Sequence, residues 1–227
     1  MSAGSSRRGE WLRDRSLTLT MLALFALCAV GQVLVGWFDF NHTATSHGDA
    51  AIAIAAYVTR GHMWEAFFEN WESEFLQMSA FVVLSAYLYQ VGSPESRRPR
   101  ALELVDADPR AFADLPDVPW PVRRGGWVLC LYEYSLGGAL FLLFLMSFAG
   151  HLLGGWAAEN AERRLHGEVA GTLLDYATSS RFWFESLQNW QSEFLSVGLM
   201  VWLAVYLRQR RSPESKPVHA SHAETGR

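Results

Sequence analysis

The heptapeptide at positions 70–76, Asn-Trp-Glu-Ser-Glu-Phe-Leu, returns at positions 189–195 as Asn-Trp-Gln-Ser-Glu-Phe-Leu. In both copies an apolar run follows at once, at positions 78–88 and 197–207. Apolar runs of this length predict buried or membrane-embedded helices. A glutamate therefore lies just before each predicted apolar helix. The rest of the chain is organised around this duplicated element.

The duplication extends well beyond the heptapeptide. Residues 16–96 align with residues 135–215 at a constant offset of 119 and without a gap. Identical residues occupy many matching positions, among them Gly31/Gly150, Gly36/Gly155, Trp37/Trp156, Asn41/Asn160, His47/His166, Tyr57/Tyr176 and Trp64/Trp183. Internal similarity of this kind predicts two tandem copies of one structural unit.

Half of the 227 residues are hydrophobic, and these residues are concentrated in long stretches. A helix of ~20 apolar residues spans a hydrocarbon core of ~30 Å. We expect spans at about 17–38 and 72–91 in the first copy and at about 135–157 and 191–208 in the second. A cleaved signal peptide is the alternative for 17–38, but that stretch is long and lacks a small-x-small cleavage site.

The expected fold is an all-α integral membrane protein. Its four transmembrane helices form two tandem parallel two-helix repeats, with interfacial amphipathic helices such as the aromatic segment at 63–71. The expected segments are an N-terminal arm at 1–15, membrane repeat 1 at 16–96, a linker at 97–126, membrane repeat 2 at 127–215 and a disordered tail at 216–227.

The basic residues predict the orientation in the membrane. Of the 19 Lys and Arg residues, all but Arg60, Arg163, Arg164 and Arg181 lie in the arm, in the linker or in the C-terminal stretch that begins at Arg208. Because Lys and Arg concentrate on the cytoplasmic side, we expect both termini and the linker to be cytoplasmic. Two spans in each copy then bring both copies into the membrane from the same side.

A polar cluster is expected inside the outer leaflet. Glu74 and Glu193 follow an interfacial tryptophan by about one turn, at a depth where an ionisable group is costly and usually faces other helices. An asparagine four residues earlier lies on the same helix face. The predicted cluster consists of Glu74, Glu193, Asn70, Asn189, Gln32 and His151. Three interpretations stay open: hydrogen bonds that fix helix register, a site or conduit for a proton or cation, and recognition of a partner protein.

The repeated tryptophans and histidines have simpler interpretations. Interface anchors are expected at Trp37, Trp64, Trp71, Trp156, Trp183 and Trp190, with a quinone or pigment pocket as the alternative. The pairs His47-Gly48 and His166-Gly167 could contribute to a metal site, but no spacing resembles a compact ligand motif. A helix-terminating turn with a left-handed glycine is favoured, and we predict no metal.

A second signature, Tyr-Leu-x-Gln-x-x-Ser-Pro-Glu-Ser, follows the heptapeptide and ends at Ser96 and at Ser215. On these two signatures the chain resembles, over residues 11–216, a bacterial family of small multi-pass membrane proteins known only as a domain of unknown function. The resemblance implies a bacterial origin and a place in the cell (inner) membrane. It implies no activity, cofactor or catalytic residue.

The function expected from the sequence is non-enzymatic. The chain carries no nucleophile elbow, phosphate-binding loop, dinucleotide fingerprint or CxxC pair, so we expect neither catalysis nor a cofactor. The basic segments flank helices and suit anionic lipid, not nucleic acid. We expect a structural or docking component of a membrane assembly, whose partners are the lipid bilayer and a second copy or another membrane protein. The alternative is a small oligomeric proton or cation channel or transporter that uses Glu74 and Glu193.

Overall fold

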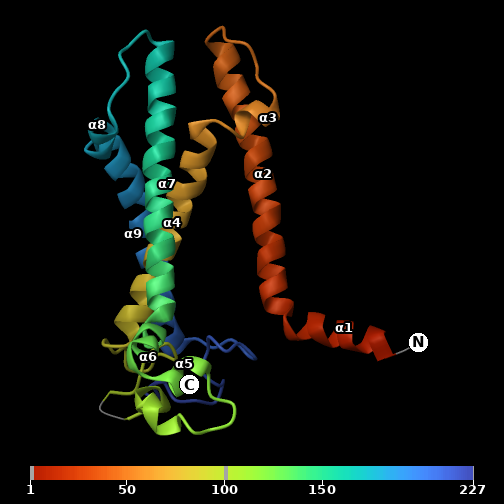
Figure 1. The fold of residues 1–227 in the computed structure, drawn as a ribbon, viewed down its shortest axis with the longest axis vertical. Coiled ribbons are helices and arrows are strands. Elements are labelled where there is room, and N and C mark those ends of the chain that lie inside the picture. Colours follow the sequence, from red (N-terminus) through yellow and green to blue (C-terminus); the bar gives the residue numbers. More distant parts are fainter. Residues whose placement is uncertain (1–2, 100–101, 227) are drawn as a thin grey trace. The chain divides into compact units, whose positions relative to one another are not determined.

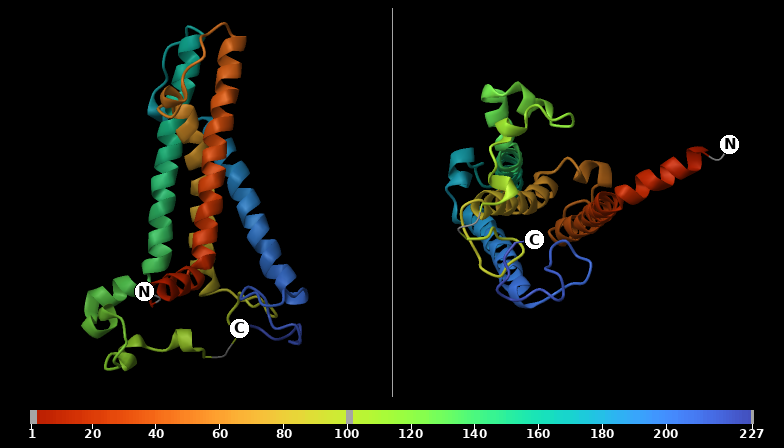
Figure 2. Two further views of the ribbon diagram at one scale, coloured as in Figure 1. Left: turned by 90° about the vertical axis from the view of Figure 1, so that its right-hand side faces the viewer. Right: turned by 90° about the horizontal axis from the view of Figure 1, so that it is seen from below.

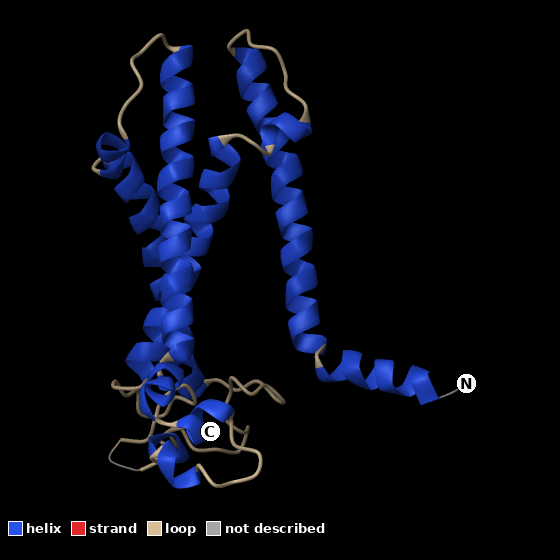
Figure 3. Cartoon of the chain, in the orientation of Figure 1, coloured by secondary structure: helices blue, strands red, loops and turns tan. Residues whose placement is uncertain are grey.

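The computed structural model describes residues 3–99 and 102–226. Residues 1, 2, 100, 101 and 227, which belong to the predicted arm, linker and tail, lie outside the described residues. Within the described residues every regular element is a helix and none is a strand (Figure 3), which confirms the all-α prediction. The chain divides into two compact units, Met1–Trp64 and Glu65–Arg227.

The helices follow one another along the chain as labelled in Figure 1. The first unit holds α1 (Ala3–Asp14), α2 (Ser16–Ser46), α3 (Ile54–Tyr57) and the start of α4 (Gly61–Ser85). The second unit holds the rest of α4, η1 (Leu104–Asp106), η2 (Pro109–Phe112), α5 (Trp120–Arg124), α6 (Gly126–Glu133), α7 (Ser135–Leu165), α8 (Leu173–Ala177) and α9 (Ser180–Tyr206).

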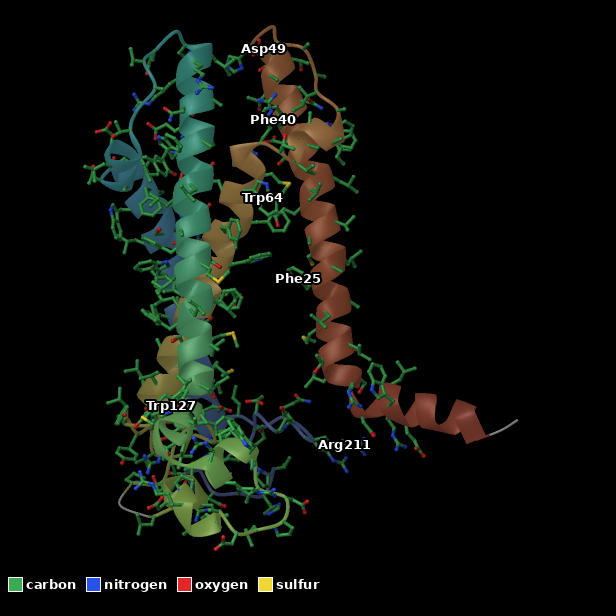
Figure 4. All side chains as sticks on the ribbon, viewed as in Figure 1. Phe25, Phe40, Asp49, Trp64, Trp127 and Arg211 are labelled. Atoms are coloured by element: carbon green, nitrogen blue, oxygen red, sulfur yellow. The ribbon has the colours of Figure 1, made fainter. Side chains whose placement is uncertain are left out.

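Two helices have the length and composition of membrane spans. α2 and α7 have 31 residues each, about 46 Å at ~1.5 Å per residue. In the described part of the chain they are the two helices long and apolar enough to cross a membrane. Figure 4 shows Phe25 in the apolar part of α2 and Asp49 at the turn beyond its end. α4, which ends at Ser85 and carries four glutamates along 65–74, does not meet this description, and neither does α9.

Both long helices end in the turn that the His-Gly pairs predict. His47 and His166 follow α2 and α7 directly, and the glycines after them have positive φ values, +88° at Gly48 and +70° at Gly167. His47 Nδ1 shares a hydrogen bond of 2.9 Å with the Thr43 carbonyl oxygen. The predicted left-handed turn is therefore confirmed at both positions.

After each turn the chain doubles back along its helix and is held by the same hydrogen bonds. The Trp37 indole and the Asn41 side-chain amide donate to the Ile52 carbonyl, and the Ile52 N–H donates to Asn41 Oδ1. The same three bonds recur 119 positions further on, among Trp156, Asn160 and Gly171. Because the side chains satisfy both polar groups of one loop residue, each loop is fixed to its own helix.

A close contact between a tyrosine and a helix glycine is also found in both units. A Cβ atom on Gly36 would collide with the Tyr57 hydroxyl group, and a Cβ atom on Gly155 would collide with the Tyr176 hydroxyl and ring. The tyrosines come from α3 and α8, the short helices that follow the doubled-back loops. Glycine at these two positions is therefore needed for the loop to dock.

In the second unit α7 lies beside α4 and α9, as the views of Figures 1 and 2 agree. The Ser79 hydroxyl on α4 donates to the Gly137 carbonyl on α7 at 3.2 Å. Further along, a Cβ atom on Gly150 would collide with the Phe68 ring. Small residues on α7 thus let α4 approach closely, and side chains from three helices meet between them.

The C-terminal segment, for which the sequence predicts disorder, has defined contacts over residues 216–226. Lys216 is 2% exposed. Its ammonium group donates to three backbone carbonyls, those of Ser221, His222 and Glu224. An ammonium group has three protons to donate, and the loop supplies an acceptor for each, which composition alone does not reveal.

Candidate functional site

His151 of α7 lies at the centre of a buried group of ionisable side chains. Its side chain is 0% exposed, and Nδ1 is 3.1 Å from Glu72 Oε2 on α4. On the other side, Nε2 is 3.5 Å from Glu185 Oε2 on α9. This second contact is an ion-pair distance without hydrogen-bond geometry, so within the described residues Nε2 is a buried nitrogen that has no hydrogen-bond partner. One imidazole ring therefore joins three helices.

Glu72 is as deeply buried as His151. Its side chain is also 0% exposed, and its Oε1 accepts a hydrogen bond of 3.1 Å from the Trp190 indole on α9. A buried carboxylate is costly unless it is paired and hydrogen-bonded. Both oxygens of Glu72 have such partners, which explains how the carboxylate is accommodated between helices.

The carboxylates of Glu65 and Glu185 share the same pair of hydrogen-bond donors, Tyr176 and Arg181. Glu65 on α4 accepts from the Tyr176 hydroxyl at 3.3 Å and from Arg181 at 3.4 Å. Glu185 lies 3.3 Å from the same hydroxyl and accepts from Arg181 Nε at 3.0 Å. A phenol carries one proton, so Tyr176 donates to one of the two carboxylates at a time.

At its edge the group reaches solvent through Arg181, and it also includes the side-chain amide of Asn189. The Arg181 side chain is 42% exposed and also donates to Glu162. The Asn189 side chain donates to Glu69 Oε1 at 2.6 Å. We refer to this set as the His151 cluster, which consists of Glu65, Glu69, Glu72, His151, Tyr176, Arg181, Glu185, Asn189 and Trp190.

Helical periodicity places the cluster residues of α4 on one face of that helix and the cluster residues of α9 on one face of the other. Glu65 and Glu72 are seven residues apart on α4, about two turns, and Glu69 lies between them on the same face. The cluster residues Arg181, Glu185 and Asn189 recur at intervals of four residues on α9. Two rows of polar side chains therefore meet at the ring of His151.

The pKa values of Glu65 and Glu185 are shifted in opposite directions. Burial raises the pKa of Glu65 to about 7; the charge of Arg181 acts against this shift, and the charge of Glu185 adds to it. Burial also acts to raise the pKa of Glu185, but His151 and Arg181 outweigh it and hold that pKa below its ordinary value. Near neutral pH, Glu65 can thus hold a proton while its neighbour stays charged. Adjacent groups with opposed pKa values are typical of sites that take up and release protons.

Two of the six predicted cluster residues belong to the His151 cluster. His151 is its centre, and Asn189 contributes the hydrogen bond to Glu69. Gln32 lies on α2 in the first unit. Asn70 is exposed and donates to the Ala66 carbonyl of its own helix.

The two glutamates of the repeated heptapeptide lie elsewhere. Glu74 is exposed and Glu193 is half-buried. Neither carboxylate has a hydrogen bond or an ion pair in the described part of the chain, although the charge of Glu74 reaches Glu193. The structure therefore places these two glutamates near each other but outside the buried network.

The predicted interface tryptophans have partners within the protein. Trp190 donates to Glu72. Trp64 and Trp183 donate to backbone carbonyls six residues earlier, and Trp37 and Trp156 hold the doubled-back loops. The Trp71 ring packs edge-on against two phenylalanine rings. An interfacial position stays a prediction for all six.

The sequence reasoning missed most of the cluster because it favoured positions identical in both copies. Six of the nine cluster residues stand at positions where the copies differ. At the offset of 119 an ionisable cluster residue stands opposite an uncharged one in five cases, Glu72/Gln191, His151/Gln32, Glu185/Ala66, Glu65/Phe184 and Glu69/Gln188. Charges present in only one copy were the available signal.

The cluster can hold and transfer protons. Among the described residues no group of three His, Cys, Asp or Glu side chains is arranged to hold a metal ion. What the geometry offers is a chain of carboxyl, phenol and imidazole groups, each 3.1–3.5 Å from the next. These groups exchange protons readily when they are in contact.

Fold and site define an α-helical protein with two helices of membrane-spanning length and a buried histidine–carboxylate cluster. The chain belongs to the family described as Domain of unknown function (DUF6766), which matches residues 8–227. The expected resemblance to an uncharacterised family is confirmed to that extent. Comparison with curated proteins and with solved structures finds no match.

Proposed function

We propose that the chain is a multi-pass protein of the bacterial inner membrane, with four spans in two tandem repeats and both termini in the cytoplasm. α2 and α7 would supply two spans, and the apolar C-terminal parts of α4 and α9 would supply the others. The hydrogen bonds repeated at an offset of 119 support the repeat. The placement of Lys and Arg supports the orientation.

Single cysteines test this topology in a background where Cys28 and Cys130 are replaced by serine. Asp49→Cys and Glu168→Cys lie in the loops expected outside, and Asp108→Cys lies in the linker expected inside. A membrane-impermeant maleimide should label the first two in intact spheroplasts and the third only after lysis. Labelling of Asp108→Cys in intact spheroplasts would contradict the orientation.

We further propose a non-enzymatic role as a structural or docking component of a membrane assembly. The observation that carries this proposal is that the buried charges are paired with one another, while large apolar side chains face outward along α9. The outward-facing residues include Phe184, Leu187, Leu195, Leu199 and Trp202. A surface of this kind suits a neighbouring transmembrane helix.

A photo-cross-linking residue at Leu199 tests the docking role in native membranes. The matched control is the same residue at Val205, which lies on the same helix and is buried. We expect one discrete cross-linked protein product, either a second copy or another membrane protein, from position 199 and none from position 205. Cross-links to lipid alone at position 199 would refute the docking role.

A second candidate is a small proton or cation channel or transporter. The proximity of Glu74 and Glu193, whose charges interact although both residues lie outside the buried network, favours it. Flux through purified protein in liposomes should then disappear in the Glu74→Gln, Glu193→Gln double variant. Absence of flux from folded wild-type protein would remove this candidate.

A further inference from the structure

We propose that the His151 cluster is a proton-binding site, in which Glu185 exchanges protons with solvent, passes them to the His151–Glu72 pair and reaches Glu65 by a relay through Tyr176. The ligand is the proton itself. This inference deepens the second candidate function but assigns the proton to different residues from the repeated glutamates.

The first observation is the unbroken order of the groups. Glu65 contacts the Tyr176 hydroxyl at 3.3 Å, and the same hydroxyl contacts Glu185 at 3.3 Å. Glu185 lies 3.5 Å from His151 Nε2, and His151 Nδ1 lies 3.1 Å from Glu72. Each contact links two groups that can gain or lose a proton, with no apolar side chain between them.

The second observation is the unpartnered nitrogen. His151 Nε2 is buried and has no hydrogen bond within the described residues, yet it faces the Glu185 carboxylate. A neutral imidazole whose Nδ1 carries the proton toward Glu72 presents a free lone pair at Nε2. Leaving that lone pair unpaired in a buried site is costly, and a proton arriving from Glu185 removes the cost.

The third observation is an excess of negative charge. Glu65, Glu72 and Glu185 face only two groups that can carry a positive charge in the cluster, Arg181 and, when protonated, His151. Glu69 adds a fourth carboxylate, and burial raises its pKa. Four buried or half-buried carboxylates facing two cations require at least one further proton, because an uncompensated charge in such a site is costly.

One carboxylate of the relay faces solvent more than the others. The Glu185 side chain is 22% exposed and pairs with Arg181, which is 42% exposed, whereas the Glu65 side chain is 9% exposed and those of Glu72 and His151 are 0% exposed. Arg181 also pairs with Glu162. Protons can therefore enter at the side that carries Glu185 and Arg181.

The proton steps balance without any other reactant. Glu185 takes a proton from solvent and gives it to the Tyr176 oxygen while the original phenol proton passes to the Glu65 carboxylate, which leaves Glu185 charged and Tyr176 neutral. A second proton taken up by Glu185 passes to His151 Nε2. The Nδ1 proton of the resulting imidazolium passes to Glu72, so that His151 ends neutral and Glu72 protonated.

Infrared difference spectra of the protein in phospholipid vesicles test the binding step, recorded from about pH 5 to about pH 9. Wild-type protein should show a protonated-carboxyl band that disappears around neutral pH. Glu65→Gln, which keeps the shape of the side chain, should remove this titration, and Glu74→Gln on the same helix should leave it intact. A wild-type protein without a carboxyl titrating near neutral pH, or an unchanged titration in Glu65→Gln, would overturn the proposal.

Tyr176→Phe tests the relay separately, because it keeps the ring against Gly155 and removes only the hydroxyl. The Glu65 titration should persist, while hydrogen–deuterium exchange of the protonated Glu65 carboxyl, followed by its infrared band, should slow by at least ~10-fold. Exchange at His151, followed by its imidazole NMR signals, should be unchanged. An unchanged exchange rate at Glu65 would eliminate Tyr176 from the path. Proton binding without flux would remove the channel candidate and retain the proton-binding site. Flux that depends only on Glu74 and Glu193, with no titration at Glu65, would retain the channel candidate and remove the proton-binding site.

Discussion

Replacing Glu72 by glutamine tests whether the His151 cluster holds the helices together. Glutamine keeps the shape of the side chain and can still accept the Trp190 indole N–H, but its amide group faces His151 Nδ1 where a carboxylate stood. Glu72 and His151 are both 0% exposed, so water cannot replace the lost partner. Removing one partner of a buried pair costs ~3–5 kcal/mol, and we expect this decrease in the free energy of unfolding.

Glu74→Gln is the matched control for this change. It makes the same chemical substitution two residues further along α4, at an exposed side chain without a hydrogen bond or ion pair in the described part of the chain. Such a surface change should alter the free energy of unfolding by less than ~0.5 kcal/mol. Reversible unfolding in mixed detergent micelles, followed by far-UV circular dichroism, measures both variants.

A double variant separates pairing from packing. His151→Gln places at position 151 the residue that the first copy carries at the equivalent position, Gln32. Because no buried charge is then left unpaired at either position, the double variant with Glu72→Gln should recover ~1–3 kcal/mol relative to the sum of the single changes. The reasoning is refuted if Glu72→Gln unfolds like the wild type, or if the two single changes add without interaction.

Three further predictions concern glycine, pH and the loop clamp. Gly155→Ala should cost ~1–3 kcal/mol because its Cβ would collide with Tyr176, whereas Gly138→Ala, on the same helix with open space around the Cβ, should gain up to ~1 kcal/mol; equal effects in the same unfolding assay would contradict the close contact. The folded pKa of Glu65, about 7, exceeds the ordinary 4.5, so the folded state binds the extra proton between these values and stability should fall by ~3 kcal/mol as the pH rises through them; Glu65→Gln should flatten this dependence, and an unchanged slope would disprove its origin in Glu65. Asn160→Ala should cost ~1–3 kcal/mol by leaving the Gly171 N–H without its acceptor, with faster hydrogen exchange at the Gly171 amide; retained protection would show that another group fixes the loop.

Local features were predictable from the sequence because their causes are local. The left-handed turns at Gly48 and Gly167 follow from a glycine placed directly after a helix, where a positive φ is needed and only glycine adopts it freely. The apolar lengths of α2 and α7 follow from composition. Even the loop clamps leave a trace, since Asn41 and Asn160 are identical residues at matching positions in an otherwise variable region.

The rotation of α4 was not predictable in the same way. Glu72 and Glu74 are two positions apart and therefore point in directions ~200° apart around the helix. Which of the two faces α7 depends on tertiary contacts, such as the Phe68 ring against the bare backbone of Gly150. Glu72 lies four residues after Phe68 on the same helix face, so this contact turns it inward and leaves Glu74 exposed.

The residues that hold the loops are identical in the two copies, whereas most ionisable residues of the His151 cluster are not. The loop-holding residues are identical because, in each copy, a tryptophan and an asparagine donate hydrogen bonds to the carbonyl of the matching loop residue. The charges differ between copies because a buried carboxylate is stable only beside a cation or a proton donor, and one imidazole can serve a single such site. A chain with histidine at both positions 32 and 151 would need a second set of carboxylates in the first copy, where Ala66 and Gln32 stand at the positions matching Glu185 and His151. Introducing Gln32→His alone should therefore leave that histidine without carboxylate partners, and proton binding should remain confined to the His151 cluster.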